Sequence, residues 1–300
     1  MIPIIDTHQH MWDLSRFELP WLDGVEALRH SYLPDDYGVA VHGTGIEQAV
    51  YMEVDVAAHQ RVSEAEYMMD LIGSGNTKTT AAVLSGHPAD PAFADYVARF
   101  AGASQVKGFR QVLQVPESVP GACLEETFVD GVRLLGSKGY LFDVCPRPAE
   151  LGDAAELAER CPDTQLILDH CGNADPNVVA RNVGEDADDG DATYSHTAAQ
   201  WRRDVERLAS RQNVVCKISG VIARAALGWT ADDLAPTINH CLDAFGADRV
   251  VFGGDWPVCT LGAGANLANW VAALREIISN RPEAEQRQLL HDNAQRIYGL

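Results

Sequence analysis

Two histidines separated by one residue stand near the start of the chain, in Asp6-Thr7-His8-Gln9-His10. They follow the apolar run Ile2-Pro3-Ile4-Ile5, which is typical of a buried β-strand. Side chains two residues apart point to the same face of a strand, so His8 and His10 are expected side by side at its carboxyl end. Neutral imidazole is the commonest metal ligand. The pair therefore indicates a divalent-metal site, although two satisfied surface histidines would show the same pattern.

Two more polar side chains stand at the ends of other apolar runs. His170 ends the run 165–170, and Asp255 ends the run 249–255. The carboxyl ends of parallel strands share one face of a barrel, so both side chains can converge with the histidine pair. Three imidazoles and one carboxylate make a suitable ligand set for one divalent metal, with room for water. The sequence therefore predicts metal ligation by His8, His10, His170 and Asp255.

Eight apolar, β-branched runs recur along the chain, with amphipathic stretches between most of them. This alternation is typical of a parallel sheet covered by helices. Eight units favour a distorted (β/α)8 (TIM) barrel, a single domain over residues 1–300, instead of an open dinucleotide-binding sheet, whose Gly-x-Gly-x-x-Gly is missing after the first strand. After the first strand, strands are expected at 46–54, 79–84, 105–110, 140–144, 165–170, 213–219 and 249–255, and helices at 93–101, 127–136, 149–160, 201–210, 234–245 and 282–300.

Composition narrows the class of protein. The 300 residues, 46% of them hydrophobic, suffice for a barrel of roughly 250 residues with extensions. A formal net charge of −20 argues against nucleic acid or an anionic membrane as a partner. No apolar stretch approaches the roughly 18 residues of a membrane span, and no secretory signal is expected because Asp6 interrupts the first apolar run. Seven scattered cysteines without a Cys-x-x-Cys pair fit reduced thiols, so a cytoplasmic location is expected.

Two longer segments are expected to form loops. Residues 14–37, rich in Pro, Trp and charge, are expected to form a loop or lid after the first strand. Residues 174–197 contain the acidic run 184–191 and are expected to form a solvated loop after the sixth strand. Calcium binding by the acidic run is disfavoured, because it lacks the spacing and the closing Glu of an EF-hand loop.

Five motifs spread over the chain carry a family resemblance. They are the histidine motif at 5–13, VKGFRQVLQ at 106–114, DHCG at 169–172, NVVCKISG at 213–220 and FGGDWPV at 252–258. With these motifs the whole chain resembles the amidohydrolase superfamily, and within it the branch of metal-dependent barrel hydrolases that includes sugar-acid lactonases. The resemblance implies the barrel, hydrolase chemistry and a lactone-like substrate.

The end of the fourth strand sets the expected number of metals. Many members of the superfamily bridge two metals with a carboxylated lysine at this place, whereas this chain has Arg110 there and Lys107 upstream. One divalent ion, with zinc as the expected ion, is therefore favoured over a two-metal centre. Some lactonases of this branch work without tightly bound metal, so direct binding of the substrate by the histidine pair stays open as an alternative.

Arg110 is permanently charged and can clamp a carboxylate with two hydrogen bonds. It is expected to contact the substrate, and the alternative is an ion pair with Asp143 or Glu53. Three other side chains near the motifs are candidates for substrate binding, with packing or support of the site as the alternative for each: Lys217, Trp12 and Trp256. Asp6 and Asp169 adjoin the motifs and are expected to orient the ligating histidines.

The predicted reaction is hydrolysis of a sugar-acid or related carboxylated lactone by direct attack of water. Asp255 is the expected general base, with His170 and Arg110 as the other catalytic residues and the metal as the group that polarises the carbonyl. The alternative is a decarboxylase of an aromatic or muconic-type acid on the same barrel. A non-catalytic binding barrel is disfavoured, because no ligand position is missing. The expected partner is a small-molecule substrate, with a homodimer as the common default assembly.

Overall fold

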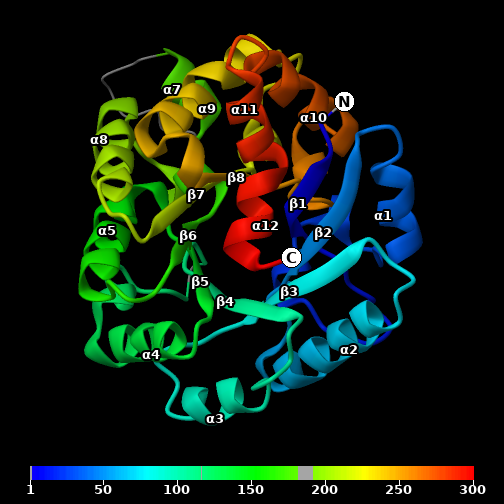
Figure 1. Cartoon of the computed structure of the whole chain (residues 1–300), viewed down its shortest axis with the longest axis vertical. Coiled ribbons are helices and arrows are strands. Elements are labelled where there is room, and N and C mark those ends of the chain that lie inside the picture. Colours follow the sequence, from blue (N-terminus) through cyan, green and yellow to red (C-terminus); the bar gives the residue numbers. More distant parts are fainter. Residues whose placement is uncertain (1, 116, 182–191) are drawn as a thin grey trace.

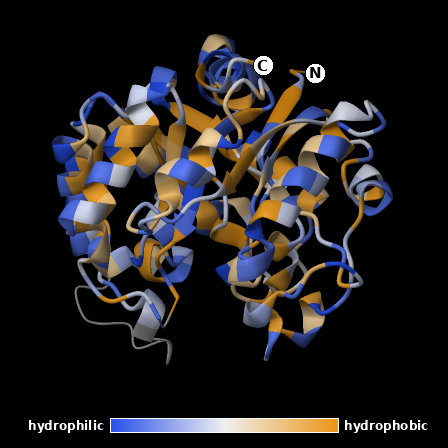
Figure 2. Cartoon of the chain, turned by 90° about the horizontal axis from the view of Figure 1, so that it is seen from below, coloured by the Kyte–Doolittle hydropathy of each residue, from blue (hydrophilic) through white to orange (hydrophobic). Residues whose placement is uncertain are grey.

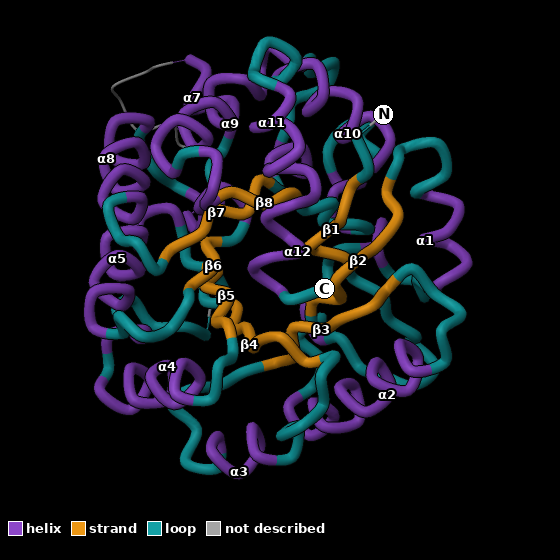
Figure 3. Tube along the Cα trace, viewed as in Figure 1, coloured by secondary structure: helices purple, strands orange, loops and turns teal. Residues whose placement is uncertain are grey.

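The computed structural model describes residues 2–115, 117–181 and 192–300, in which eight parallel strands form one sheet in sequence order. Figures 1 and 3 show the strands arranged around a common centre, with most of the helices outside them. All eight predicted strands are present, and the TIM-barrel prediction is confirmed. The strands are β1 (Ile4–Gln9), β2 (Ile46–Met52), β3 (Thr79–Ser85), β4 (Val106–Val112), β5 (Leu141–Cys145), β6 (Leu166–Leu168), β7 (Val214–Ile218) and β8 (Val250–Phe252).

The barrel closes between its last and first strands, just beyond the end of β8. The N–H of Asp255 donates to the carbonyl of His8 at 2.7 Å, and the N–H of His10 donates to the carbonyl of Trp256 at 2.8 Å. Gln9 and Trp256 form a parallel bridge in the same seam. The backbone that joins the two edges of the sheet therefore also carries three of the predicted metal ligands.

The helices cover the outside of the barrel with their apolar faces. In α8, for example, Trp201, Val205 and Leu208 are buried at helical spacing, and Thr197 caps the helix by accepting from the N–H of Gln200 at 3.1 Å. The helices are α1 (Pro34–Ala40), α2 (Arg61–Gly73), α3 (Phe93–Ala98), α4 (Glu126–Ser137), α5 (Leu151–Arg160), α6 (His170–Asn173), α7 (Pro176–Arg181), α8 (Ala198–Ala209), α9 (Ala231–Phe245), α10 (Leu267–Ile277), α11 (Glu283–Arg287) and α12 (Asn293–Tyr298). In Figure 2 the strands are largely hydrophobic, while the helices carry both hydrophilic and hydrophobic residues.

The C-terminal segment covers the amino ends of the strands, as the position of α12 in Figure 1 shows. Ala294 and Tyr298 pack with the inward-facing apolar residues of the barrel. Asn293 donates to the carbonyl of Val250 at 2.8 Å, and Lys107 donates to the carbonyl of Gly299 at 3.0 Å. The helical prediction for 282–300 is confirmed, with a π-helical turn between α11 and α12. Access to the barrel interior is therefore left to the carboxyl ends of the strands.

The long segments after β1 and β6 are only partly irregular. Residues 14–37 contain two 3-10 turns and the start of α1, and Trp12 bridges to Tyr32 across them. Residues 174–197 contain α7, while the acidic run 184–191 lies outside the described residues. Over the described part of the chain, we find no helix with the length and apolar character that crossing a membrane requires.

Candidate active site

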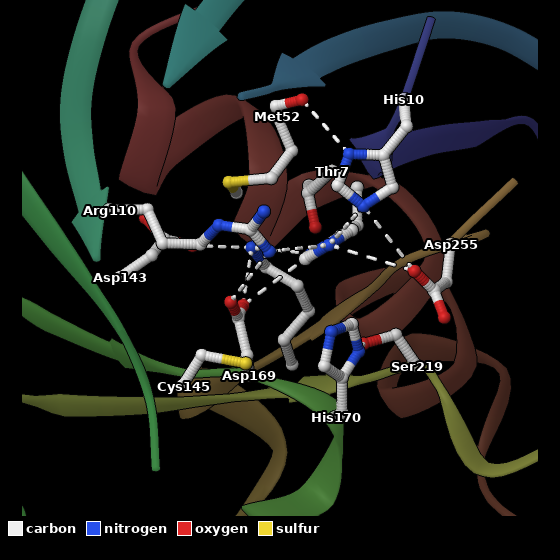
Figure 4. Close-up of polar contacts among 12 residues, drawn as sticks. Thr7, His10, Met52, Arg110, Asp143, Cys145, Asp169, His170, Ser219 and Asp255 are labelled. Carbon is white, nitrogen blue, oxygen red and sulfur yellow. Dashed lines mark hydrogen bonds and ion pairs between the residues drawn. The ribbon is translucent and has the colours of Figure 1, made fainter. Parts of the chain in front are cut away.

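A cavity of about 420 Å³ lies at the carboxyl ends of the strands. Its wall combines charged, imidazole and amide side chains with a similar number of apolar ones. Figure 4 shows how His10, His170 and Asp255 surround one space, with Arg110 and Asp169 beside it. The lining residues are His10, Trp21, Val25, Val54, Asp55, Arg110, Val112, Gln114, Val115, His170, Asn173, Tyr194, Gly220, Ala223, Arg224, Asp255, Val258 and Leu261.

His8, His10 and Asp255 form a tight group of potential ligands. The Nε2 atoms of His8 and His10 lie 3.1 Å apart, and Asp255 Oδ1 lies 3.8 Å and 3.5 Å from them. A tetrahedral zinc with bonds of about 2.1 Å places its donor atoms about 3.4 Å apart. The three atoms therefore match the spacing that one ion requires.

The protonation of the histidine pair also fits a metal. His10 Nδ1 lies 3.0 Å from the carbonyl oxygen of Met52, which can only accept, so Nδ1 carries a proton and Nε2 is the atom that can ligate a metal. Burial, assisted by the charge of Lys217, lowers the pKa of His8 well below its usual range. Metal ligation needs neutral imidazoles. The free Nε2 of His10 and the lowered pKa of His8 therefore both fit a divalent cation at this site.

His170 belongs to a second, overlapping group that also contains His8 and Asp169. Its ring centroid lies 4.5 Å from that of His8, and its Nδ1 lies 3.0 Å from Ser219 Oγ. Burial lowers the pKa of His170, which favours the neutral form of this imidazole. The structure thus brings the four predicted ligands into one site, but with His170 beside the tight group of three, and its ligation stays a prediction.

An unusual backbone places His170 in the cavity. His170, Cys171 and Asn173 all have left-handed φ angles, between 52° and 56°, directly after β6. Gly220, with φ of 71°, packs against the imidazole so closely that a Cβ there would lie 2.6 Å from the ring. A glycine is therefore required at this position both by the backbone conformation and by the space that His170 occupies.

Asp169 joins the histidines to a buried group of charges beneath them. Its Oδ1 lies 3.0 Å from Lys217 Nζ and 3.5 Å from His8 Nδ1. Burial alone would raise the pKa of Asp169, but Lys217 and His8 hold it well below its usual range. Lys217 is completely buried and also pairs with Asp143, whose pKa burial raises to about 7 against the effect of Lys217. Asp169 is therefore an anion that faces His8, and its role in orienting this histidine stays a prediction.

Arg110 forms an ion pair with Glu53, one of the two alternatives to a substrate contact that the sequence offers. Its Nε donates to Glu53 Oε1 at 2.7 Å, and its NH2 donates to the carbonyl of the same residue at 2.8 Å. Burial alone would lower the pKa of Arg110, but Glu53 and Asp169 raise it, so the guanidinium keeps its charge. Its NH1 lies 3.4 Å from His8 Nε2, so Arg110 also borders the tight group.

Three predicted substrate-binding residues are not among the described residues that line the cavity. Lys217 lies below the histidines, Trp12 packs edge-on against Trp21, and Trp256 packs against Tyr37. The indole that does line the cavity is that of Trp21, whose N–H donates to the carbonyl of Val54 at 2.8 Å. These positions give Lys217, Trp12 and Trp256 supporting places, and a direct substrate contact by them stays a prediction.

Asp6 orients backbone groups instead of imidazole rings. It accepts from the N–H groups of His8 at 3.0 Å and Gly254 at 2.7 Å, and from the hydroxyl of Tyr37 at 2.8 Å. Asp6 thus ties β1 to the residues after β8. Other residues of the cavity wall, such as Asp55, Gln114 and Asn173, follow strands at positions that periodicity does not mark, and they are not among the predicted site residues.

The amidohydrolase family model matches residues 5–300, and the chain belongs to this family, which is metal-dependent. The L-fucono-1,5-lactonase of Burkholderia multivorans is 32% identical over 303 residues, covering 99% of this chain and 96% of that protein. The L-rhamnono-gamma-lactonase of Scheffersomyces stipitis is 25% identical over 215 residues, covering 65% and 59%. A crystal structure of an amidohydrolase from Burkholderia multivorans with bound zinc has a TM-score of 0.82 at 28% identity, covering 99% of both chains.

Proposed function

We propose that this protein is a lactonase that opens the cyclic ester of a sugar acid. The observation that carries the proposal is the convergence of His8 Nε2, His10 Nε2 and Asp255 Oδ1 beside a cavity at the carboxyl ends of the strands. Barrel enzymes build their sites at this end. The names of the two lactonase relatives support a cyclic ester as the substrate.

The metal in this proposal is one divalent cation, most simply zinc. His8, His10 and Asp255 would hold it, with His170 as a further ligand. When bound, the ion supplies Lewis-acid polarisation of the ester carbonyl. The zinc in the related amidohydrolase structure supports this choice.

Asp255 is the proposed general base. Its Oδ1 faces the two imidazoles, which leaves Oδ2 to accept a proton from the attacking water. The water oxygen then bonds to the carbonyl carbon, the ring ester bond breaks, and the proton passes from Asp255 to the leaving alkoxide. The product is the open hydroxy acid, and no covalent enzyme intermediate is needed. Arg110, whose NH1 borders the same space, is proposed to stabilise the carbonyl oxygen.

In this proposal the substrate is a neutral sugar lactone instead of a carboxylated one. Two arginines line the cavity, and the guanidinium of Arg224 lies over the ring of Tyr194. The charge of Arg110 is already compensated by Glu53, with which it makes two hydrogen bonds, so it is poorly placed to clamp a substrate carboxylate. The wall combines apolar side chains such as Val112 and Leu261 with hydrogen-bonding groups such as Asp55 and Asn173. Such a wall suits a compact ring that carries hydroxyl groups and an apolar edge.

A pH-indicator assay with a panel of 1,5- and 1,4-sugar lactones tests the proposal, with spontaneous hydrolysis subtracted. We expect enzyme-dependent acid release by the wild type, and a fall of roughly 10²–10⁴-fold in kcat for Asp255→Asn assayed in its zinc-loaded form. Asp248→Asn, a change outside the cavity wall, serves as the matched control. Near-full turnover by zinc-loaded Asp255→Asn contradicts the assignment of the base. Release of carbon dioxide from an aromatic or muconic acid, without any lactone opening, would establish the decarboxylase alternative instead.

A further inference from the structure

Asp55 is a carboxylate in the cavity wall that the proposed chemistry leaves unused. It follows β2 by three residues and shares the wall with His10, Arg110 and Asp255. Within 2–115, 117–181 and 192–300, no residue donates a hydrogen bond to its carboxylate or forms an ion pair with it, and only its backbone N–H is engaged. Its carboxylate oxygens are therefore available to a molecule in the cavity.

Each of the two neighbouring amides of the wall, Asn173 and Gln114, already uses one of its polar atoms within the protein. Asn173 Nδ2 donates to Gln114 Oε1 and to the carbonyl of Pro146, both at 2.8 Å. Gln114 Oε1 also accepts from the thiol of Cys145. These contacts hold the amides to the wall, in contrast to the carboxylate of Asp55.

The backbone of Asp55 is held in a conformation that non-glycine residues rarely adopt. Its φ is 49°, in the left-handed region, and its N–H donates to Glu53 Oε2 at 2.8 Å. The other oxygen of Glu53 accepts from Arg110 Nε at 2.7 Å. Such a conformation persists where surrounding contacts impose it. Arg110 also lies beside His8, one of the proposed metal ligands. The ion pair of Arg110 and Glu53 therefore helps to hold the backbone conformation of Asp55 next to the metal site.

The environment of this carboxyl group makes it a selective acceptor. Burial, and then the charge of Glu53, raise the pKa of Asp55 to about 6. A partly desolvated carboxylate gains by accepting a hydrogen bond from a ligand hydroxyl, and it repels a ligand carboxylate. A ring lactone of a sugar acid offers several hydroxyl donors, whereas a carboxylated lactone brings a second negative charge.

We propose that Asp55 is a specificity-determining residue that accepts hydrogen bonds from hydroxyl groups of a neutral polyhydroxylated lactone and disfavours carboxylated lactones. This proposal rests on the proposed lactonase function. It predicts that the contribution of Asp55 depends on the hydroxyl groups of the substrate and not on the ester that reacts.

Two variants distinguish the effect of losing the Asp55 carboxylate from the effect of disturbing the strained backbone at this position. Asp55→Asn keeps one acceptor oxygen, and asparagine tolerates left-handed φ well. Asp55→Gly removes the side chain where an alanine would be strained at φ of 49°. Asp23→Gly, which removes a surface carboxylate outside the cavity wall, is the matched control. Melting temperature and zinc content of each variant show whether the fold and the metal group are retained.

The deciding measurement compares L-fucono-1,5-lactone with δ-valerolactone, a six-membered lactone without hydroxyl groups. For the hydroxylated lactone, Asp55→Gly should lower kcat/KM by about ten- to a hundredfold, mainly through KM, with a smaller loss in Asp55→Asn. For δ-valerolactone, both variants should stay within about threefold of the wild type.

Equal losses on the two lactones, or a fall in kcat at unchanged KM, would overturn the assignment of Asp55 while leaving the lactonase function intact. If Asp55→Gly loses its fold or its zinc, the comparison of the two lactones with Asp55→Asn decides alone. Failure of the wild type to open either lactone would refute the lactonase function, and the role of Asp55 with it.

Discussion

The backbone N–H of Asp255 donates to the carbonyl oxygen of His8 at 2.7 Å. One hydrogen bond therefore links the two edges of the barrel through two of the proposed metal ligands. The next bond of the seam, from His10 to Trp256, brings the third ligand into the same framework. Because the closure uses main-chain atoms, side-chain substitutions at His8, His10 and Asp255 leave its hydrogen bonds available, and their effects on metal binding can be measured in a folded barrel.

His10→Asn tests the metal group. We expect the zinc content of the purified protein to fall from about one ion per chain to a small fraction, because one of three donors is lost while the seam bond of residue 10 is kept. Metal analysis after dialysis measures this, and urea unfolding of the metal-free proteins checks the fold. The control, His59→Asn, lies in a 3-10 turn outside the cavity wall and should keep the zinc. Full zinc binding by His10→Asn would exclude this histidine as a ligand.

Lys217→Met tests the buried charges beneath the histidines. Lys217 is fully buried between Asp143 and Asp169, so its removal leaves two buried carboxylates without their cation. We expect a loss of about 3–5 kcal/mol in the free energy of unfolding, measured with urea. Lys138→Met, at an exposed position, should change it by less than about 0.5 kcal/mol. Similar stabilities for the two variants would show that Lys217 is not needed to compensate these carboxylates.

His87→Gln tests a pH-dependent part of the stability outside the metal group. Burial, followed by the charge of Arg61, lowers the pKa of His87 to about 4. In the unfolded chain the pKa of His87 is near 6.5, so between pH 6.5 and pH 4 the unfolded chain binds a proton that the folded protein does not bind. The stability that neutral His87 contributes is therefore present above pH 6.5 and is lost as the pH falls. We expect wild-type stability to fall from pH 7.5 to pH 5 by about 1–2 kcal/mol more than that of His87→Gln. Parallel urea-unfolding profiles for the two proteins would contradict this.

Gly220→Ala tests the placement of His170. The added Cβ would lie 2.6 Å from the imidazole, so the ring must move away from Ser219. Gly228→Ala is a matched control, because Gly228 has a similar φ of 81° but open space around it. Both variants should lose about 1–2 kcal/mol of stability from backbone strain. Only Gly220→Ala should lose lactonase turnover, by roughly tenfold or more. Equal activities would show that His170 is not held in place by the close approach of Gly220.

Local patterns in the sequence determined the barrel and the core of the site. The strands are predicted from apolar, β-branched runs, and the period of two places His8 and His10 on one face of the first strand whatever their partners are. His170 and Asp255 follow their strands directly, so the parallel arrangement alone brings them to the same end of the barrel. These inferences need only short-range geometry and the rule that parallel strands end at one face.

Only the tertiary structure decided which groups these side chains touch. The pairing of Arg110 with Glu53, the position of Lys217 below the site and the choice of Trp21 over Trp12 in the wall join residues from separate strands and loops. The left-handed φ of Asp55 likewise depends on Glu53, whose carboxylate accepts a hydrogen bond from Arg110 of β4. Such contacts depend on the relative positions of segments distant in sequence, and burial then decides their energy. The type and spacing of residues along one segment therefore specify the ligand atoms, while long-range packing specifies their neighbours and charges.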